Sequence, residues 1–433
     1  VFTIFRPTSL SSFSYPPTPS SHFLPQIGFS MMDSFDNIPF PKNNISYNAD
    51  ISVNLRDTRL AIAPGNLMNA SNLMYDYLEQ ICSFVYKQSG SELNSLSELV
   101  ENAKTVLLVN DEKSKACPWS NYPIPQSSSL WSLYDELCTL IVSSGLIYHQ
   151  IALNTISKEG NSRISDLVWK KAVNCLQQSS SLTQAFKPYI TAAPHSDNIL
   201  YVEHLNSILL QITVVMRNIE TQYKNLNTDD DILQSASRSN AIFIRILVFI
   251  YNEAVKLESS SSPMHWEMPY GCYKKFLEVL LCYYSALNEY GQNKMGVALA
   301  LTEYGILAAS EQSKTKARLG IRSRKVLSGS KIRESKLWRD EVILRKNFKR
   351  HLPGALQRTL TETVKLLRVM YVRFEKMNTT LNFDEVPKME EIEEKHLFSS
   401  DSLPGGMAVP VSKTKQFRPM CLGGKELSER KYY

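Results

Sequence analysis

The sequence predicts an all-α fold, and three observations support that prediction. Eight of the 20 prolines lie in the first 64 residues, whereas residues 127–187 and 195–262 contain none, so helices can run there without interruption. Apolar residues through most of the chain recur at the i, i+3, i+4, i+7 spacing of a buried helix face. Connections such as 225–231 and 291–293 are short, which favours antiparallel neighbours. We therefore expect an irregular curved helical solenoid that contains tetratricopeptide-like hairpins.

The chain opens with a segment that we expect to be disordered. Its first 30 residues hold seven Ser and five Pro, and the prolines separate the apolar residues that would otherwise form the core of a signal peptide. Two methionines follow at Met31 and Met32, and the residues before Met31 could be a translated leader. We therefore assign no function to them. We divide the chain into a disordered leader (1–36), a helical domain (37–387) and an irregular C-terminal tail (388–433).

The helical domain begins with a segment in which the sequence suggests strands. Short apolar segments at 51–55 and 59–62 predict two strands, which would form a small N-terminal β-sheet. Helices are predicted after them at 67–87, 130–151, 164–186, 199–225, 232–257, 273–290, 295–309 and 356–377. In the second of these helices, Ser143, Ser144 and Gly145 would let a neighbouring helix approach closely. His149 of the same helix is expected to be a hydrogen-bonded core residue.

Residues 273–309 give the clearest helical hairpin. Two apolar helical patterns are joined there by a short Gly-Gln-Asn turn, as in a tetratricopeptide-like hairpin. The small residues expected where the two helices touch are Ala286, Ala298, Ala300 and Ala308. No 34-residue period recurs elsewhere, which argues against a regular repeat array.

Composition and motifs argue against an enzyme. The 433-residue chain has seven Cys but no C-x-x-C, so neither a zinc ribbon nor a redox dithiol is encoded. The phosphate-binding, dinucleotide-binding, nucleophile-elbow and zinc-protease motifs are missing from the sequence, and its seven His lack metal-ligand spacing. The longest apolar stretch, 241–251, is too short to cross a bilayer. We predict no catalytic residue, no metal site, no cofactor and no transmembrane helix.

One segment concentrates the positive charge. Residues 311–350 carry 14 Lys and Arg against four acidic residues, although the whole chain has a formal charge of only +6. The simplest interpretation is a solvated loop. The more specific interpretation is a patch that binds anionic lipid head groups, where each basic residue near the membrane contributes about 1 kcal/mol of binding free energy. Nucleic acid ranks third, because no aromatic platform is interleaved with the charges. The candidate membrane patch consists of Arg318, Arg322, Arg324, Lys325, Lys331 and Arg333.

Several motifs, taken in order, resemble a known family. They are Trp131-Ser-Leu-Tyr-Asp-Glu-Leu, Trp169-Lys-Lys-Ala, Ile250-Tyr-Asn-Glu-Ala, Tyr273-Lys-Lys-Phe-Leu-Glu and Gly296-Val-Ala-Leu-Ala. Their order is similar to that of the Bro domain, the boomerang-shaped helical domain of Alix, BROX and their fungal relatives. The Asn-Ile-Pro-Phe-Pro opening at Asn37 and the segment 375–387 are most similar to the fungal pH-response regulators of the PalC group. The resemblance spans about residues 38–387.

The resemblance implies a non-enzymatic adaptor. Bro domains bind the C-terminal amphipathic helix of the main filament-forming ESCRT-III subunit through an apolar patch. PalC-like proteins connect an arrestin-related, ambient (alkaline) pH-signalling complex to that subunit. In this chain the matching helix is 205–223, and core packing competes with partner binding as the role of its apolar side chains. The candidate partner-binding residues are Ile208, Leu209, Ile212, Val215, Met216 and Ile219.

The resemblance, the cysteine usage, the basic segment and the helical hairpin together give the expected location and the alternatives. We expect a cytoplasmic protein that is recruited peripherally to endosomal or plasma membrane, with an anionic lipid surface as a further partner and no nucleic acid. The close alternative is a general endosomal-sorting Bro-domain protein. An alternative of a different class is a tetratricopeptide-like chaperone adaptor.

Overall fold

The structure is a computed structural model, and its described residues confirm the all-α prediction. They are residues 38–90, 93–109, 117–122, 130–157, 164–225, 239–260, 270–311, 341–401, 403–410 and 416–424. Within these ranges the regular elements are helices, and extended backbone pairs only at isolated bridges such as Pro41 with Trp119 and Tyr47 with Val109. The described residues all belong to one compact unit.

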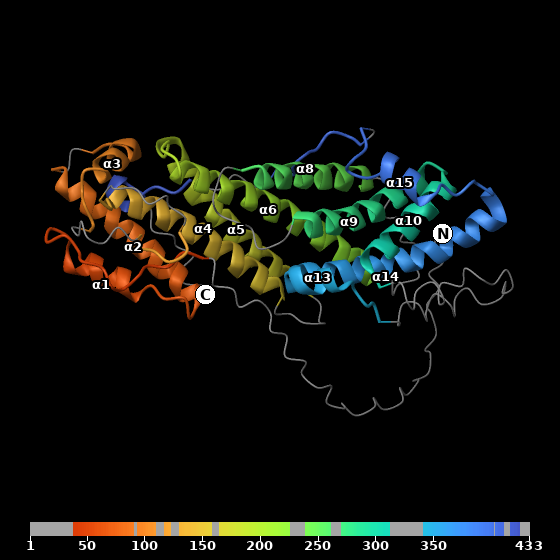
Figure 1. The fold of residues 1–433 in the computed structure, drawn as a ribbon, viewed down its shortest axis with the longest axis horizontal. Coiled ribbons are helices and arrows are strands. Elements are labelled where there is room, and N and C mark those ends of the chain that lie inside the picture. Colours follow the sequence, from red (N-terminus) through yellow and green to blue (C-terminus); the bar gives the residue numbers. More distant parts are fainter. Residues whose placement is uncertain are drawn as a thin grey trace, which may run out of the picture. The chain divides into compact units, whose positions relative to one another are not determined.

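The helices follow one another along the chain as the hydrophobic periodicity predicts (Figure 1). The longer ones are α1 (Val53–Ala61), α2 (Leu67–Gln88), α3 (Leu96–Ala103), α4 (Leu133–Ser157), α5 (Asp166–Phe186), α6 (His195–Asn225), α8 (Asn240–Glu258), α9 (Tyr270–Gly291), α10 (Met295–Ala309) and α14 (Gly354–Met377). The shorter ones are α13 (Lys346–His351), α15 (Met389–Lys395) and the turns η2 (Lys187–Tyr189), η3 (Asn378–Asn382) and η4 (Met420–Leu422). All eight predicted helices are present, although residues 232–238 of one prediction lie outside the described ranges.

The predicted N-terminal β-sheet is wrong. Residues 53–61 form α1, and the hydroxyl of Ser52 caps it by accepting a hydrogen bond from the backbone N–H of Leu55 at 3.4 Å. Leu55, Arg59 and Ile62 are all buried, and their spacing of four and three residues is that of a helix face. The apparent strands were too short for a period of two to be distinguished from this helical spacing.

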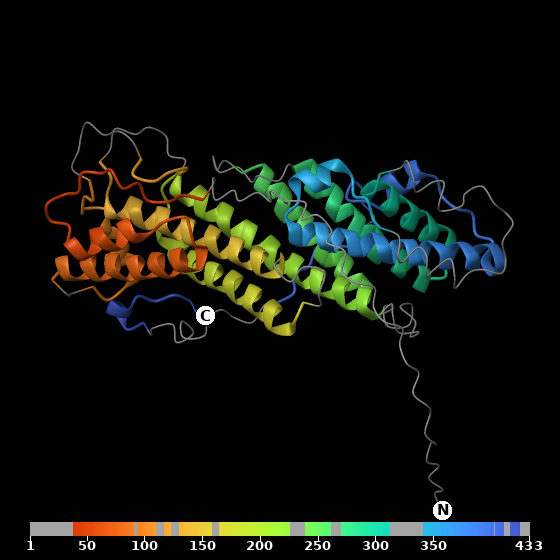
Figure 2. The same cartoon turned by 90° about the horizontal axis from the view of Figure 1, so that it is seen from below.

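Successive long helices pack against each other in order. Contacts connect α2 with α4, then α4 with α5, α5 with α6, α6 with α8, α8 with α9 and α9 with α10 (Figures 1 and 2). The α9–α10 pair is the hairpin expected from the sequence, and Ala286, Ala298 and Ala300 are buried within it. Helix α14 then packs on α10, α6 and α9, which joins the end of the helical domain to its middle.

Small residues allow the helices to approach as expected around Gly145. A Cβ atom at Gly145 of α4 would lie 2.6 Å from Cγ1 of Val202 in α6 and 3.2 Å from the hydroxyl of Ser179 in α5. By length and composition α4 and α6 could each cross a membrane, but 78% and 67% of their most apolar stretches are buried inside this fold. Their apolar character is therefore accounted for by their central position among other helices.

A buried ion pair fixes α1 to α4. The Glu136 carboxylate of α4 accepts hydrogen bonds from Arg59 Nε at 2.6 Å, the Tyr77 hydroxyl at 3.0 Å and the indole N–H groups of Trp119 and Trp131 at 2.7 and 2.8 Å. The Arg59 guanidinium also donates to the carbonyl oxygens of Lys42 and Pro118. Both charged side chains are fully buried, and each nitrogen of the Arg59 guanidinium and each oxygen of the Glu136 carboxylate has a hydrogen-bond partner.

A second buried carboxylate connects α6 to the start of α5. Glu220 accepts hydrogen bonds from the backbone N–H of Ile164 at 2.9 Å and from the indole N–H of Trp169 at 3.0 Å. Its cations are Lys224 at 2.8 Å and Arg358 of α14 at 3.6 Å. This contact ties three separate parts of the chain together.

Candidate functional site

The structure corrects the predicted partner-binding face of α6. All six candidate residues are in the hydrophobic core, where none is more than 5% exposed: Ile208, Leu209, Ile212, Val215, Met216 and Ile219. The reason is that α6 is contacted by α4, α5, α8 and α14, so most of its circumference faces other helices. A helix with apolar residues around most of its surface is typically central, and the core interpretation of these six side chains is the correct one.

A narrower face of α6 still reaches the surface. Leu200 is 37% exposed, Ser207, Leu210 and Val214 are half-buried, and Arg217 is exposed. We call these five residues the outer α6 face. Leu200 and Ser207 are seven residues apart, and the later members follow at intervals of three and four residues. These spacings place all five along one side of the helix.

The C-terminal tail lies beside this face. The amide of Gln211 donates to the Val409 carbonyl at 3.1 Å and accepts from the Val409 N–H at 2.9 Å. Arg245 of α8 also makes two hydrogen bonds to the tail. Its Nε donates to the Gly405 carbonyl, and its backbone carbonyl accepts from the Met407 N–H. The tail predicted to be irregular therefore has little regular structure but specific hydrogen bonds to α6 and α8.

The end of the tail packs on the first helices. Phe417 is buried against Phe186 of α5 and Tyr75 of α2, with ring centroids 5.7 Å apart in both pairs. The backbone N–H of Met420 donates to the Glu79 carboxylate of α2 at 3.0 Å. The tail thus contacts helices that are separated from it by most of the sequence.

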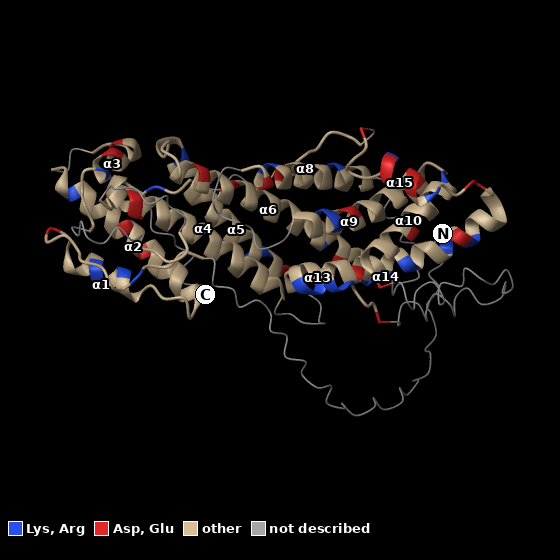
Figure 3. Ribbon diagram, in the orientation of Figure 1, with Lys and Arg blue, Asp and Glu red and all other residues tan. Residues whose placement is uncertain are grey.

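The predicted basic membrane patch lies outside the described residues. Arg318, Arg322, Arg324, Lys325, Lys331 and Arg333 all fall in 312–340, so the structure neither places nor tests them. Of the basic segment, residues 311 and 341–350 are described, and in α13 Lys346, Lys349 and Arg350 are exposed. Figure 3 shows their charge beside the N-terminal part of α14, and shows that α15 is acidic.

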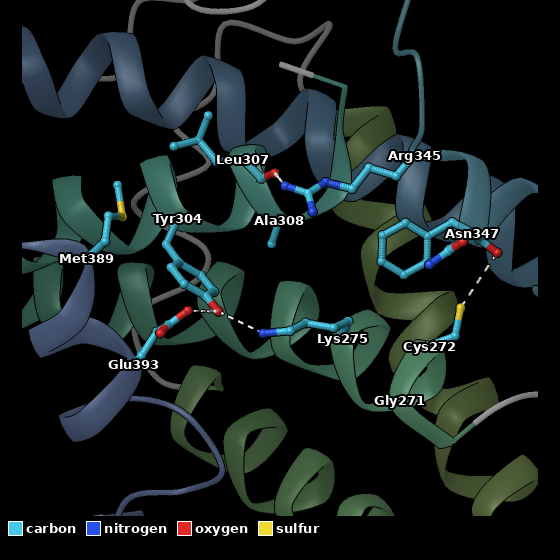
Figure 4. A pocket seen from close by; sticks show the side chains of 11 residues that line it. Gly271, Cys272, Lys275, Tyr304, Leu307, Ala308, Arg345, Asn347, Met389 and Glu393 are labelled. Atoms are coloured by element: carbon cyan, nitrogen blue, oxygen red, sulfur yellow. Dashed lines mark hydrogen bonds between the residues drawn. The ribbon is translucent and has the colours of Figure 1, made fainter.

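A pocket of about 310 Å³ lies where α9, α10, α13 and α15 meet (Figure 4). Leu307, Ala308, Phe348 and Met389 give it an apolar lining. Its polar lining comes from all four helices and the residue before α13: Cys272, Lys275, Tyr304, Arg345, Asn347 and Glu393. The size and the mixture of apolar and polar groups are those of a site for a small ligand or a single side chain.

Three polar groups of the pocket form a chain of hydrogen bonds. The Lys275 ammonium donates to the Tyr304 hydroxyl at 3.1 Å, and the Tyr304 hydroxyl donates to Glu393 at 3.1 Å (Figure 4). The same ammonium forms an ion pair with Glu278 at 2.7 Å. Burial disfavours the charged ammonium, but the hydrogen bonds to Glu278 and Tyr304 outweigh it and raise the pKa of Lys275. Burial raises the pKa of Tyr304 to about 12.

These pKa shifts limit what the pocket can do chemically. Lys275 stays protonated and so is not a nucleophilic amine, and Tyr304 stays a neutral phenol. Burial also raises the pKa of the Cys272 thiol, which disfavours the reactive thiolate. Arg345 donates to the Leu307 carbonyl at 2.5 Å, near the C-terminus of α10. The arrangement suits binding better than covalent or acid–base catalysis.

The histidines of the interior hold helices together. The Nε2 atom of His149 lies 3.1 Å from Asn206 Oδ1 of α6 and 3.0 Å from the Ser179 hydroxyl of α5, which confirms its prediction as a hydrogen-bonded core residue. His195, at the start of α6, lies between the Tyr122 hydroxyl at 2.9 Å and Asp135 of α4 at 3.0 Å. Within the described ranges, no group of three or more His, Cys, Asp and Glu side chains could hold a metal ion.

The sequence did not reveal the pocket. Lys275 and Tyr304 lie 29 residues apart, and Glu393 lies 89 residues beyond Tyr304, so no local spacing announces their contact. A partial signal was available at Lys275 and Glu278, because a basic and an acidic residue three positions apart on a helix form an ion pair. That pairing says nothing about the cavity beside it.

A family profile covers the helices that form the pocket and the tail. The profile of a family of unknown function (DUF5355) matches residues 131–433, well over half of the chain. The chain belongs to the DUF5355 family. The DUF5355 match begins at Trp131, whose indole N–H donates to Glu136, and it includes α4 to α15 and the tail. The curated proteins contain no match to the chain.

Proposed function

We propose that this DUF5355 chain is a non-enzymatic adaptor of the Bro type, which binds the C-terminal amphipathic helix of an ESCRT-III filament subunit. The observation that supports it best is the order of the helices. Each motif that resembles the Bro domain lies on or beside a long helix of one continuous stack: Trp131 before α4, Trp169 in α5, Ile250 in α8, Tyr273 in α9 and Gly296 in α10. We place the adaptor in ambient (alkaline) pH signalling at endosomal or plasma membrane.

The burial of the six original candidates moves the proposed docking site to the outer α6 face. Leu210 and Val214 are four residues apart and half-buried, so an amphipathic partner helix could cover them. Arg217, exposed and paired at its edge with Asp166 at 3.0 Å, would give a polar contact at the rim. The six buried residues would support this face from beneath.

The chemistry of the pocket is consistent with an adaptor. Its lysine and tyrosine are held in their protonated forms, and its thiol has a raised pKa, so the groups are equipped to bind and not to attack a substrate. The interior histidines are engaged in contacts between helices.

The test is a titration of the protein with the C-terminal helical peptide of the ESCRT-III filament subunit. The double variant Leu210→Asn with Val214→Asn should bind the peptide at least about tenfold more weakly, because two half-buried apolar anchors are lost. Val255→Asn, on α8 and 38% exposed, is the matched control and should bind like the wild type. Thermal unfolding of all three proteins checks that they are folded.

Absence of peptide binding by the wild type would refute the proposed function. Equal binding by the wild type and the folded double variant would refute the outer α6 face as its site.

A further inference from the structure

We propose that the loop after α14 is a membrane-inserting tip, with Leu381 and Phe383 as the side chains that enter the lipid interface. Among the described large apolar side chains these two have the largest exposed fractions, 71% and 74%. They stand two residues apart, and Val386, 40% exposed, follows them. In both views the C-terminal end of α14, where the loop begins, lies at the edge of the helices (Figures 1 and 2).

The backbone at Phe383 shows that the fold itself does not need an aromatic side chain there. Phe383 has φ of 56°, in the left-handed region that favours Gly and Asn. Among the described residues, the other non-glycine residues with positive φ are Asn121 and Asn293. An asparagine at 383 would suit the backbone better, so the exposed phenyl ring is best explained by a contact outside the chain.

The loop is held rigidly in this conformation. Asn378 and Asp384 bond reciprocally: the Asn378 amide donates to the Asp384 carbonyl at 3.0 Å, and the Asp384 N–H donates to the Asn378 side chain at 2.8 Å. The Asp384 carboxylate accepts from the N–H groups of Met295 and Gly296 at the start of α10. A Cβ atom at Gly296 would lie 2.1 Å from the Glu385 carbonyl, so the loop sits directly against α10.

Internal hydrogen bonds favour lipid over a protein groove as the occupant of this tip. The hydroxyls of Thr379 and Thr380 donate to the carbonyls of Glu375 and Lys376, and the Phe383 N–H donates to Asn378. Polar groups that are paired within the loop lose little when water is removed, which is the condition that a lipid interface imposes. Leu381 and Phe383 are also each more than 70% exposed, so they project from the loop instead of lining a cleft.

The exposed charges next to the tip are of both signs, because the acidic helix α15 begins directly after Lys388. Lys376 and Lys388 are exposed on either side of the loop, where long basic side chains can reach the head groups. Between them the sequence has two acids, and the Asp384 carboxylate is occupied at the start of α10, which leaves Glu385 exposed. This small charge balance implies that apolar insertion, and not attraction to charge, supplies most of the tip's own contribution to binding.

Two apolar side chains bind a membrane weakly, so the tip would act together with a second contact. The inference does not depend on the proposed helix partner. It requires only that the folded chain meet a lipid surface, and its test is therefore read separately from the peptide titration.

Flotation with phosphatidylcholine vesicles, with and without phosphatidylserine, tests the tip. The double variant Leu381→Asn with Phe383→Asn should float at least about tenfold less than the wild type on both kinds of vesicle. The matched control, Val53→Asn with Leu167→Asn, removes two apolar side chains that are 66% and 61% exposed elsewhere, and it should float like the wild type. The loss should persist at high salt, because the tip acts through apolar contact.

A direct measurement accompanies the flotation. Tryptophan emission of Phe383→Trp, compared with that of the wild type, should gain a component that brominated phosphatidylcholine quenches. The proposal is wrong if the wild type does not float, if the tip variant floats as well as the control, or if the emission gained by Phe383→Trp is not quenched. Loss of peptide binding by the tip variant with unchanged flotation would instead assign the tip to a protein partner and overturn the inference.

Discussion

Two buried carboxylates, Glu136 in α4 and Glu220 in α6, hold different parts of this molecule together in different ways. Each accepts a hydrogen bond from an indole N–H, and each is at most 3% exposed. The cation that neutralises Glu136 is Arg59, which is also fully buried. The cations near Glu220 are Lys224 and Arg358, whose side chains are 27% and 20% exposed.

The difference shows that accessibility of the cation decides how much a buried acid matters. If Glu136 loses its charge, Arg59 is left as a buried cation that cannot reach water. If Glu220 loses its charge, Lys224 can turn outward and be hydrated. We call the Arg59–Glu136 contact between α1 and α4 the first joint, and its loss should strongly destabilise the fold. We call the Glu220 contact the second joint, and its loss should destabilise the fold less.

The largest effect is expected when the first joint is broken. Glu136→Gln should lower the free energy of unfolding by about 3–5 kcal/mol, because it leaves the Arg59 charge without its partner. Chemical denaturation of the purified variant measures this loss. In the double variant Arg59→Met with Glu136→Gln much of the stability should return, since no buried charge remains unpaired. A single variant as stable as the wild type would show that Arg59 reaches solvent.

The buried, neutral His149 should make the free energy of unfolding depend on pH. His149 of α4 lies against Asn206 of α6, and burial lowers its pKa to about 4. In the unfolded chain an ordinary histidine, with a pKa near 6.5, binds a proton first as the pH falls. Stability is therefore complete above about pH 6.5 and falls by about 3 kcal/mol as the pH approaches 4.

The measurement is the free energy of unfolding of His149→Gln and of the wild type across this pH range. The variant should have the flatter profile. Asp135 does not confuse the comparison. Burial opposes its ionisation, but hydrogen bonds from His195 and Ser132 hold its pKa below the ordinary value, so its contribution is lost only at still lower pH. Equal slopes for the two proteins would contradict the assignment to His149.

The smallest effects are expected at the second joint. Glu220→Gln should cost about 1–2 kcal/mol, because the hydrogen bonds from Ile164 and Trp169 weaken while Lys224 turns to water. Lys224→Met, which removes only the partly exposed cation, should change stability by less than about 1 kcal/mol. Denaturation curves of both variants test whether Glu220→Gln loses more stability than Lys224→Met. A loss at Glu220 as large as that at Glu136 would remove the distinction between the two joints.

The sequence by itself determined the class of fold and the positions of the long helices. Proline-free segments and apolar residues three and four apart specify helices locally, and Gly145 and His149 could be assigned to helix contacts for the same reason. The N-terminal strands were mistaken because two short apolar runs at 51–62 fit both periods, and only the burial of Arg59 beside Leu55 distinguishes them.

Only the tertiary structure decided which surfaces remain for partners. Ile212 and its neighbours have the spacing of a docking face, but four helices surround α6, and no local pattern records how many neighbours a helix has. Lys275, Tyr304 and Glu393 meet across more than a hundred residues of chain, so their pocket is a product of packing. Leu381 and Phe383 were visible in the sequence as apolar residues, but their exposure depends on the Asn378–Asp384 bonds that fix the loop against α10.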